Sequence, residues 1–299
     1  MKTGFVGIIG RPNVGKSTLL NAILGEKIAI TTEKPQTTRN AIRGIYTHYS
    51  DDELPEDLQM IFIDTPGIHR PRTKLGSYMT DAAIGTLKEV DAIIFIVDDK
   101  LSDGPGDKYI VDLLDGVVTP KILVINKIDK MQPDEFAEIY KEYEDLGLFE
   151  EIIGVSAKEG THVENVIKEV AQFMEEGPMY FPDDMITEHP ERFVVSEIIR
   201  EKILMYLQDE VPHGVAVEIE QYKEEEKITK IHAVIYCEKK SHKGMIIGKG
   251  GRKLKGIGKS AREEIEVLLG TKVYLELWVK VKENWRDSDV ALSNFGYKE

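Results

Sequence analysis

One eight-residue stretch near the N-terminus constrains the fold of this 299-residue chain more than any other feature. It reads Gly10-Arg11-Pro12-Asn13-Val14-Gly15-Lys16-Ser17 and matches the pattern GxxxxGK(S/T) in full. An apolar strand, Phe5–Ile9, precedes it, and a helical pattern, Ser17–Leu24, follows it. In this context the backbone N–H groups of the loop converge on phosphate oxygens at the positive end of the helix. The stretch therefore predicts a phosphate-binding loop, or P-loop.

The chain around this loop alternates short β-branched runs with longer helical patterns. Such alternation favours an α/β fold, a mostly parallel sheet with helices on its faces. The expected strands are residues 4–9, 44–49, 59–63, 92–97, 121–125 and 152–155. Ligands of such sheets bind beyond the carboxyl ends of the strands. We therefore expect functional residues in the loops that follow these runs.

Composition sets the limits within which this fold must be built. The hydrophobic fraction, 41%, and the length are sufficient for two domains. The formal net charge is −14. All of it arises from residues 1–184, which contain 33 acidic and 19 basic residues, whereas residues 185–299 contain 20 of each. No apolar run reaches the ~18–20 residues of a membrane-spanning helix, and the start Met1-Lys2-Thr3-Gly4 leads us to expect neither a signal peptide nor a transit peptide. The single cysteine, Cys237, excludes an intramolecular disulfide and favours a reducing, cytoplasmic compartment.

A second motif, Asp64-Thr65-Pro66-Gly67, follows the strand at 59–63. We expect Asp64 to hold Mg²⁺ through water, and the Gly67 amide to sense a γ-phosphate. In the P-loop, Lys16 would neutralise charge on the β- and γ-phosphates and Ser17 would bind Mg²⁺. Read alone, the tetrapeptide is also compatible with a plain turn.

The third motif, Asn126-Lys127-Ile128-Asp129, ends the strand at 121–125. A carboxylate at Asp129 accepts hydrogen bonds from the N1 and N2 protons of guanine, a pattern that adenine does not offer, so the motif favours GTP over ATP. Asn126 would tie this loop to the P-loop, and the stem of Lys127 would cover the base. A fourth, weaker motif, Ser156-Ala157-Lys158, would offer the Ala157 amide to the guanine O6.

These four motifs, in this order, resemble the translation-factor class of P-loop GTPases over residues 1–175. The resemblance places the first switch at Gln36-Thr37-Thr38-Arg39-Asn40. It implies Mg²⁺ ligands at Ser17, Thr38 and Asp64, with Thr37 as the alternative to Thr38, and catalytic roles for Lys16, Thr38, Gly67 and Asn13. The implied nucleotide contacts are Gly10, Arg11, Pro12, Asn13, Val14, Gly15, Lys16, Ser17, Thr18, Asp64, Thr65, Pro66, Gly67, Ile68, Asn126, Lys127, Ile128, Asp129, Ser156, Ala157 and Lys158.

Ile68 departs from the signalling GTPases, which place at this position a glutamine that orients the attacking water. Isoleucine neither donates nor accepts a hydrogen bond, so we expect slow intrinsic hydrolysis. The chain is similar here to a subgroup with a hydrophobic residue at this site. In some of its members the P-loop asparagine, here Asn13, ligates a potassium ion, and a simple loop-capping role for Asn13 is the alternative.

Residues 176–190 break the pattern with Glu-Glu-Gly-Pro, Phe-Pro-Asp-Asp and His-Pro sequences, and we interpret them as an interdomain linker. The remainder predicts the order αββααβ. Its elements are a helix at 191–207, strands at 214–223 and 227–238, a short helix, a glycine-rich loop, a helix at 252–269 and a strand at 271–281. We expect Cys237 to be a small core residue. Trp278 on the last strand either stacks on a base or packs against a neighbouring element, and we favour packing.

The glycine-rich loop, Gly248-Lys249-Gly250-Gly251, resembles the GxxG loop of a type II KH domain. The expected RNA contacts are Ile247, Gly248, Lys249, Gly250, Gly251, Arg252 and Lys253. The stretch Lys239–Arg262 holds nine basic residues and no acidic one, which favours contacts with phosphates. Taken alone, the loop is also compatible with a helix-capping turn.

The two halves together resemble the Era family of GTPases. The resemblance implies a P-loop GTPase domain at 1–175, a linker at 176–190, a smaller α+β type II KH domain at 191–284 and a tail at 285–299. It also implies hydrolysis of GTP to GDP with Mg²⁺, and binding of small-subunit (16S) ribosomal RNA near its 3′ end in assembly of the small ribosomal subunit. We further expect a cytoplasmic monomer with peripheral contact to the inner face of the cell membrane.

Three other classes of protein account for parts of the pattern. A tRNA-modifying GTPase has similar motifs but needs a catalytic cysteine near its C-terminus, whereas the only cysteine here is Cys237. A metabolic GTPase does not need the basic stretch Lys239–Arg262. A protein that only binds RNA does not need the nucleotide motifs.

Overall fold

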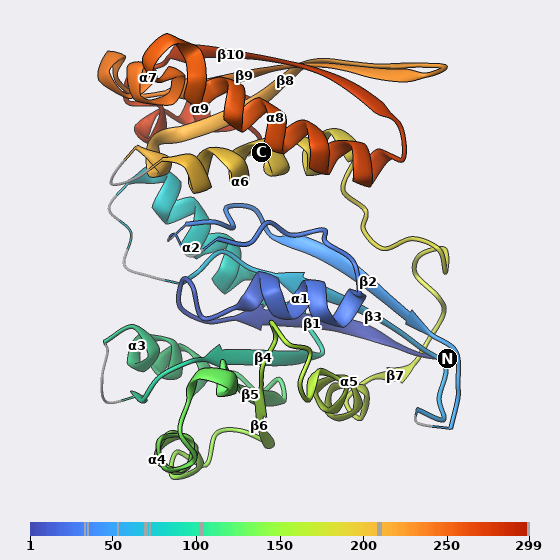
Figure 1. Ribbon diagram of the computed structural model, residues 1–299. Helices are drawn as coiled ribbons and strands as arrows, with labels where there is room; N and C mark the ends of the chain where they lie inside the picture. The colour runs from blue at the N-terminus through green and yellow to red at the C-terminus, as the bar shows by residue number, and fades with distance from the viewer. Residues whose placement is uncertain are drawn as a thin grey trace. The chain divides into compact units, whose positions relative to one another are not determined.

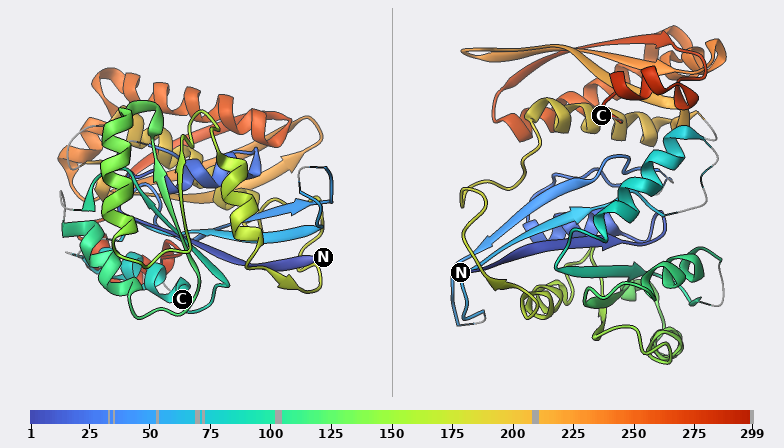
Figure 2. Two further views of the ribbon diagram at one scale, coloured as in Figure 1. Left: turned by 90° about the horizontal axis from the view of Figure 1, so that it is seen from below. Right: turned by 180° about the vertical axis from the view of Figure 1, so that it is seen from behind.

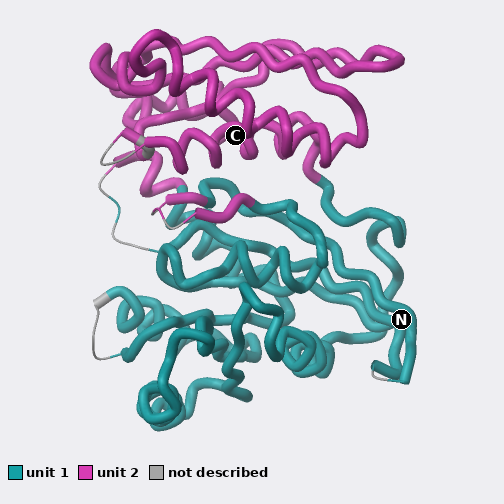
Figure 3. Tube along the Cα trace, in the orientation of Figure 1, with its two compact units in different colours: residues 1–29, 38–71, 79–188 teal, residues 30–37, 72–78, 189–299 magenta. Residues whose placement is uncertain are grey.

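The computed structural model describes residues 1–32, 34, 36–52, 54–68, 71, 73–101, 105–207 and 211–297. The chain forms two compact units, which Figure 3 distinguishes by colour. Unit 1 comprises residues 1–29, 38–71 and 79–188, and unit 2 comprises residues 30–37, 72–78 and 189–299. Each unit has its own sheet and its own hydrophobic core.

The sheet of unit 1 confirms the predicted, mostly parallel arrangement (Figure 1). Its strands are β1 (Lys2–Ile9), β2 (Ile42–His48), β3 (Leu58–Asp64), β4 (Ala92–Val97), β5 (Lys121–Asn126), β6 (Glu151–Val155) and the short β7 (Glu175–Glu176). The order is β2-β3-β1-β4-β5-β6, with β7 paired to β1. Only β2 and β7 pair in the antiparallel sense among the described strands of this sheet. The carboxyl ends of β1, β3, β4, β5 and β6 therefore meet at one edge, where the motif loops begin.

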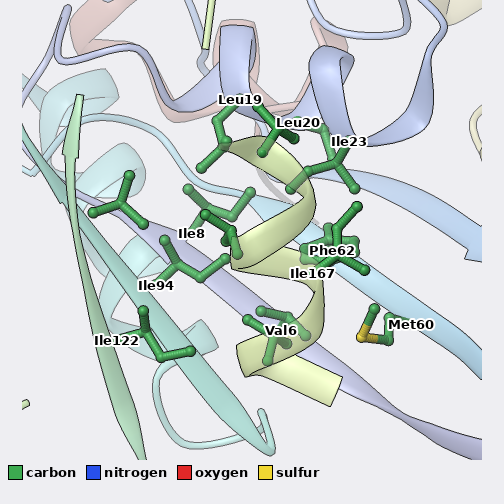
Figure 4. Packing of buried hydrophobic residues seen from close by; sticks show 14 of the residues in the cluster. Val6, Ile8, Leu19, Leu20, Ile23, Met60, Phe62, Ile94, Ile122 and Ile167 are labelled. Carbon is green, nitrogen blue, oxygen red and sulfur yellow. The ribbon is translucent and has the colours of Figure 1, made fainter. Parts of the chain in front are cut away.

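Helices cover both faces of this sheet, as Figures 1 and 2 show. They are α1 (Lys16–Leu24), α2 (Lys74–Thr86), α3 (Pro105–Leu114), α4 (Pro133–Glu144) and α5 (Val163–Ala171). Because successive strand residues point to opposite faces, Ile94 joins one core cluster with α1 and α5, whereas Phe95 joins another with α3 and α4. Figure 4 shows residues of the first cluster, among them Leu20 of α1 and Ile167 of α5. Burial on both faces explains why β4 and β5 are almost entirely apolar.

Unit 2 contains the predicted order αββααβ. Its elements are α6 (Glu191–Tyr206), β8 (Val215–Glu225), β9 (Ile228–Cys237), α7 (Lys240–Ile247), α8 (Arg252–Leu269) and β10 (Lys272–Val281). The sheet has the order β10-β9-β8, in which β9 is parallel to β10 and antiparallel to β8. The inward residues of β9 alternate, and Ile235 and Cys237 are fully buried against α6 and α8. Cys237 is thus the core residue that the sequence predicts.

The segment predicted as a tail, 285–299, belongs to unit 2 in the structure. It forms a turn of 3₁₀ helix, η5 (Trp285–Asp287), and a short helix, α9 (Asp289–Asn294). Trp285 is fully buried and its indole N–H donates to the Gly214 carbonyl at 2.9 Å. Phe295 packs edge-on against this ring. One buried tryptophan holds the segment in place, and the sequence pattern did not reveal it.

Part of the predicted linker at 176–190 lies along unit 1. Ile45 of β2 donates its N–H to the Ile186 carbonyl at 2.9 Å. Within β3, the Gln59 side chain accepts hydrogen bonds from the Tyr180 and Phe181 N–H groups at 2.7 and 3.0 Å. The linker is therefore anchored to unit 1 through much of its length.

Two segments inside the predicted GTPase range group with unit 2. In residues 30–37, the Thr31 N–H donates to the Glu201 carboxylate of α6 at 2.9 Å. In residues 72–78, the Lys74 N–H donates to the Asp287 carboxylate at 3.0 Å. Both segments precede the predicted domain boundary at residue 175, yet they group with unit 2. Each is held by a carboxylate of unit 2 that lies more than 100 residues further along the chain.

Candidate functional site

The P-loop lies between β1 and α1, and close packing determines which residues it contains. A Cβ atom at Gly15 would lie 2.1 Å from Nδ2 of Asn126, so no other residue fits there without displacing that side chain. Asn126 donates from Nδ2 to the Val14 carbonyl at 2.8 Å. This hydrogen bond is the predicted tie between the third motif and the P-loop.

The ammonium of Lys16 is enclosed by this loop. Its Nζ donates to the carbonyls of Gly10 and Arg11 at 3.1 and 2.7 Å, and the residue is 5% exposed. Burial lowers the pKa of Lys16 to about 8, although the nearby Asp64 favours the charged form. A bound phosphate would add negative charge beside this amine and so stabilise its protonated state.

Three oxygen-bearing side chains meet at the start of α1. Ser17 Oγ donates to Asp64 Oδ2 at 2.6 Å and lies 2.8 Å from Thr38 Oγ1, which itself donates to Asp64 Oδ2 at 3.2 Å. The second carboxylate oxygen, Oδ1 of Asp64, is buried without a hydrogen-bond partner among the described residues. Burial raises the pKa of Asp64 to about 6, against the opposing effect of Lys16. Hard oxygen donors with one orphaned carboxylate oxygen fit Mg²⁺, whose charge would keep Asp64 ionised.

The structure distinguishes between the two switch threonines. Thr37 turns its hydroxyl away, donating to the Lys34 carbonyl at 2.6 Å and lying 2.7 Å from Thr32 Oγ1. Thr38 is 5% exposed and lies beside Ser17 and Asp64. The geometry therefore supports Thr38 as the magnesium ligand over Thr37.

The residues after Asp64 lie against the P-loop. A Cβ atom at Gly67 would lie 2.7 Å from the backbone nitrogen of Pro12, so glycine permits this close approach. Ile68 donates its N–H to the Gly10 carbonyl at 3.1 Å, and its side chain is buried in a core cluster of unit 1. This side chain is consequently not placed to order a water molecule.

The loop expected to bind guanine begins with Lys127 and continues into a turn of 3₁₀ helix, η2 (Ile128–Lys130). Ser156 Oγ donates to Asp129 Oδ1 at 2.6 Å, and this hydrogen bond lowers the pKa of Asp129. The hydroxyl of Ser156 thus holds the carboxylate that is expected to read the base. The sequence motif did not assign this role to Ser156. The Ala157 N–H, expected to contact the guanine O6, donates to Asn126 Oδ1 at 3.0 Å.

Not every predicted residue converges on this site. Lys158 is exposed and pairs with Glu159 at 3.0 Å. Residues 69–70, which follow Ile68, lie outside the described part of the chain. All four motif loops are nevertheless linked to one another through the hydrogen bonds of Asn126, Ser17 and Ser156.

The GxxG loop forms a separate candidate site in unit 2. It is a turn of 3₁₀ helix, η4 (Lys249–Gly251), between α7 and α8. Gly250 has φ of 62°, in the left-handed region, and a Cβ atom there would meet nothing within 4 Å. Since a side chain would have space here, it is the left-handed backbone conformation that favours glycine at this position.

Basic side chains surround this loop. Lys249 and Arg252 are exposed, and Arg252 Nε donates to the Lys249 carbonyl at 3.3 Å. Further along α8, Lys259 and Arg262 pair with glutamates of the same helix at 3.7 and 3.4 Å. Among the described residues no ion pair is seen for Lys249, whose charge remains available to a phosphate.

Trp278 does not pack against a neighbouring element, so that prediction was wrong for the described part of the chain. It is 58% exposed on the outer face of β10, and its indole N–H donates to Glu276 at 3.1 Å. Tyr274, on the same face, is 50% exposed. Helices α6 and α8 pack on the inner face of the sheet, opposite to these two rings.

Comparison with known proteins identifies a GTPase domain and a KH domain in this chain. Residues 5–127 match a family described as 50S ribosome-binding GTPase, and residues 210–286 match the KH domain family. The chain is 61% identical to GTPase Era of Alkaliphilus oremlandii (strain OhILAs), over 99% of each chain. It is 56% identical to GTPase Era of Clostridioides difficile (strain 630), over 100% of this chain and 99% of that one. A crystal structure of Era in complex with MgGDPNP and nucleotides 1506–1542 of 16S ribosomal RNA superposes with a TM-score of 0.93 at 39% identity, covering 100% of both chains.

Proposed function

The chain belongs to the Era family of GTPases, and on that premise we propose that it couples a GTP-hydrolysing site to recognition of ribosomal RNA. It hydrolyses GTP to GDP with Mg²⁺ in unit 1. Through the GxxG loop of unit 2 it binds 16S ribosomal RNA near the 3′ end, in assembly of the small ribosomal subunit. Support for the RNA comes from the relative of known structure that was crystallised with nucleotides 1506–1542.

The observation that carries the proposal is the presence of two assembled sites in one chain. The first is the trio of Ser17, Thr38 and Asp64, with contacts of 2.6 to 3.2 Å beside a P-loop lysine. The second is a GxxG loop with open space around Gly250 and an exposed Lys249 beside it. Each site alone is compatible with another class of protein, whereas the combination is accounted for by a GTPase that acts on RNA.

The side chains of unit 1 divide the work of hydrolysis. Ser17, Thr38 and Asp64 would hold Mg²⁺, which supplies positive charge to the phosphates. Lys16 neutralises charge on the β- and γ-phosphates, and Gly67 lies close to Pro12 of the P-loop, where its amide would sense the γ-phosphate. Asp129, held by Ser156, reads the base. Because Ile68 is buried, the attacking water is ordered by another group, and we propose a potassium ion ligated by Asn13 for this role.

In unit 2, recognition rests on charge and close approach. The loop backbone around Gly250 is unobstructed, so a sugar-phosphate chain reaches it without displacing side chains. Lys249, Arg252 and Lys253 add phosphate contacts, and unstacked bases supply sequence preference. Residues 1–184 carry the whole net negative charge of the chain and therefore repel RNA.

Location and oligomeric state are further parts of the proposal. Among the residues that the structure describes, no helix combines the length and the apolar character that crossing a bilayer requires. We propose a cytoplasmic monomer that contacts the inner face of the cell membrane peripherally. Sedimentation of the purified protein, alone and with lipid vesicles, measures both properties.

The experiment that tests the proposed function combines both activities in the full chain. Phosphate release from GTP is measured alongside the affinity for an RNA that spans nucleotides 1506–1542 and for a scrambled RNA of equal length. We expect Mg²⁺-dependent hydrolysis and a preference for the ribosomal sequence. Lys16→Ala should weaken GTP binding ~100-fold, because it removes a buried cation that contacts the phosphates, whereas the exposed Lys88→Ala should have no effect. Equal affinity for both RNAs would refute the assignment to this region of the RNA.

A further inference from the structure

Asp98 lies outside the four sequence motifs, yet its carboxylate contacts cationic side chains from two of the motif loops. Asp98 directly follows β4, at the edge of the sheet where the motif loops begin. Its Oδ1 lies 3.3 Å from Nη2 of Arg11 in the P-loop, and its Oδ2 accepts a hydrogen bond from Nζ of Lys127 in the guanine loop. The side chains of Asp98, Arg11 and Lys127 are 20%, 27% and 34% exposed, so both contacts are partly shielded from solvent.

Arg11 has a second carboxylate on its other side. Nε of Arg11 lies 2.7 Å from Oδ2 of Asp107, in the first turn of α3 and 1% exposed. The Nε–H does not point toward that oxygen, so the contact is ionic without a well-aligned hydrogen bond. A Cβ atom at Gly106 would lie 2.6 Å from Cδ of Arg11, so glycine leaves room for the arginine. The Arg11 side chain, 27% exposed, therefore lies between the carboxylates of Asp98 and Asp107.

Lys127 connects Asp98 to the P-loop a second time. Its Nζ also donates to the Asn13 carbonyl at 2.8 Å. Asn13 and Lys127 both have positive φ, 69° and 68°, a conformation that residues other than glycine adopt infrequently. A positive φ costs conformational free energy at each of these residues. The hydrogen bond to Asn13 and the ion pair with Asp98 help to hold the two loops in this conformation.

The charges around this carboxylate differ from those of an ordinary surface ion pair, which contributes little. Two cations from two separate loops converge on Asp98, and both loops belong to the candidate nucleotide site. The neighbouring Asp99 is exposed and accepts a hydrogen bond from the backbone N–H of Lys100 at 2.8 Å. The chain thus offers a matched control in the adjacent residue.

We propose that Asp98 is a positioning residue for guanine-nucleotide binding, which holds the P-loop and the guanine loop in one relative geometry through Arg11 and Lys127. The inference rests on the proposed function, since a guanine nucleotide is the ligand that both loops share. Asp98 acts through the two cations and not on the nucleotide itself. Without its charge, Lys127 is released from one of its two contacts and the base-covering stem becomes mobile.

The test compares Asp98→Asn with Asp99→Asn in the full chain. A fluorescent GDP analogue with Mg²⁺ gives the dissociation constant and the dissociation rate of each variant. We expect Asp98→Asn to bind about tenfold more weakly, mostly through faster dissociation, because charge-assisted contacts on two loops are lost. Asp99→Asn should match the wild type. Equal affinities of the two variants would overturn the proposal.

A double-mutant cycle separates positioning from general destabilisation. In a Lys127→Met background, Asp98→Asn should cost only about threefold in GDP affinity, because one of the two cations through which it acts is already gone and the contact with Arg11 remains. A tenfold loss in that background as well would overturn the proposal. If Asp98→Asn lacks the wild-type circular dichroism, Arg11→Gln tests the same link from its other end. We expect it to weaken GDP binding about threefold, and wild-type affinity of that variant would refute the link.

The outcomes also separate this inference from the proposed function. A wild-type protein that bound no GDP would overturn both. A wild-type protein that bound GDP, together with an Asp98→Asn variant of equal affinity, would overturn only the role of Asp98.

Discussion

The nucleotide site and the GxxG loop differ in how their residues are held. In unit 1 the functional side chains hold one another, as Ser17 does with Asp64 and Ser156 with Asp129, at 2.6 Å in each case. In unit 2 Lys249 and Gly250 of the functional loop are exposed, and a Cβ atom at Gly250 would meet nothing within 4 Å. A small ligand of fixed shape calls for preformed geometry, whereas a flexible polyanion calls for charge and access.

This difference has a consequence for substitutions. In unit 1 a substitution removes a ligand contact and also leaves a buried group without its partner, so losses should be large and specific to one chemical feature of the ligand. In unit 2 a substitution should act mainly through charge, and salt should reduce the loss.

The largest expected effect concerns the base. Asp129→Asn should weaken GTP binding about 100-fold and shift preference toward xanthine nucleotides, because an amide and a carboxylate present opposite hydrogen-bonding patterns. Competition binding with guanine, xanthine and adenine nucleotides measures the shift. Asp134→Asn, on the exposed start of α4, is the matched control. Equal affinity of the wild type for GTP and ATP would contradict the assignment of Asp129.

An intermediate effect concerns the missing glutamine. If potassium at Asn13 orders the reaction, hydrolysis should be about tenfold faster in potassium than in sodium at equal ionic strength, since an added charge stabilises the transition state. Asn13→Ala should abolish the difference between the two cations while GDP still binds. A wild-type rate that is the same in both salts would leave Asn13 with its capping role.

The smallest expected effect concerns pH. Burial raises the pKa of Asp107 to about 6, even though Arg11 favours the ionised form. A carboxyl with a raised pKa stabilises the fold most at low pH, and that contribution is lost as pH rises through about 6. Between about pH 5 and 7.5 the wild type should lose about 1 kcal/mol of unfolding free energy relative to Asp107→Asn.

Urea unfolding at several pH values measures this difference, with Asp112→Asn on the exposed side of α3 as control. Identical pH dependence of the wild type and Asp107→Asn would mean that Arg11 fully compensates the burial of Asp107.

Much of this molecule was predictable because its signals are local. The strands of unit 1 follow apolar runs, and the P-loop and GxxG motifs fix both the backbone and the neighbouring elements, as at Gly15 and Gly250. The family resemblance favoured Thr38 and left Thr37 as the alternative, since the two hydroxyls are adjacent in the sequence, and the fold shows that Thr38 faces Asp64.

The features that the sequence missed depend on contacts between distant residues. Trp285 ties the C-terminal segment to Gly214, which lies 71 residues earlier in the chain. Asp98 meets Arg11 across 87 residues. Trp278 was predicted to pack, yet it is 58% exposed, and the described helices α6 and α8 pack on the opposite face of its sheet. Periodicity gives the face on which a residue lies but not the layer that covers it.

The nucleotide and the RNA are bound by different residues in different units, although the two sites are coupled. One pair of substitutions tests this division most directly. Lys249→Asp combined with Gly250→Asp puts negative charge where the RNA backbone approaches most closely. Lys223→Asp combined with Lys227→Asp is a control on the hairpin of the same unit, with a larger change in charge. RNA affinity and GTP affinity are measured for both variants in GDP and in a nonhydrolysable GTP analogue.

We expect the first pair to lose RNA binding by ~100-fold or more while GTP affinity and unstimulated hydrolysis stay at the wild-type level. The control pair should retain RNA binding, and RNA affinity of the wild type should differ between the two nucleotide states. Unchanged RNA affinity after the substitutions at Lys249 and Gly250 would contradict the account, because the GxxG loop would then lie outside the RNA site.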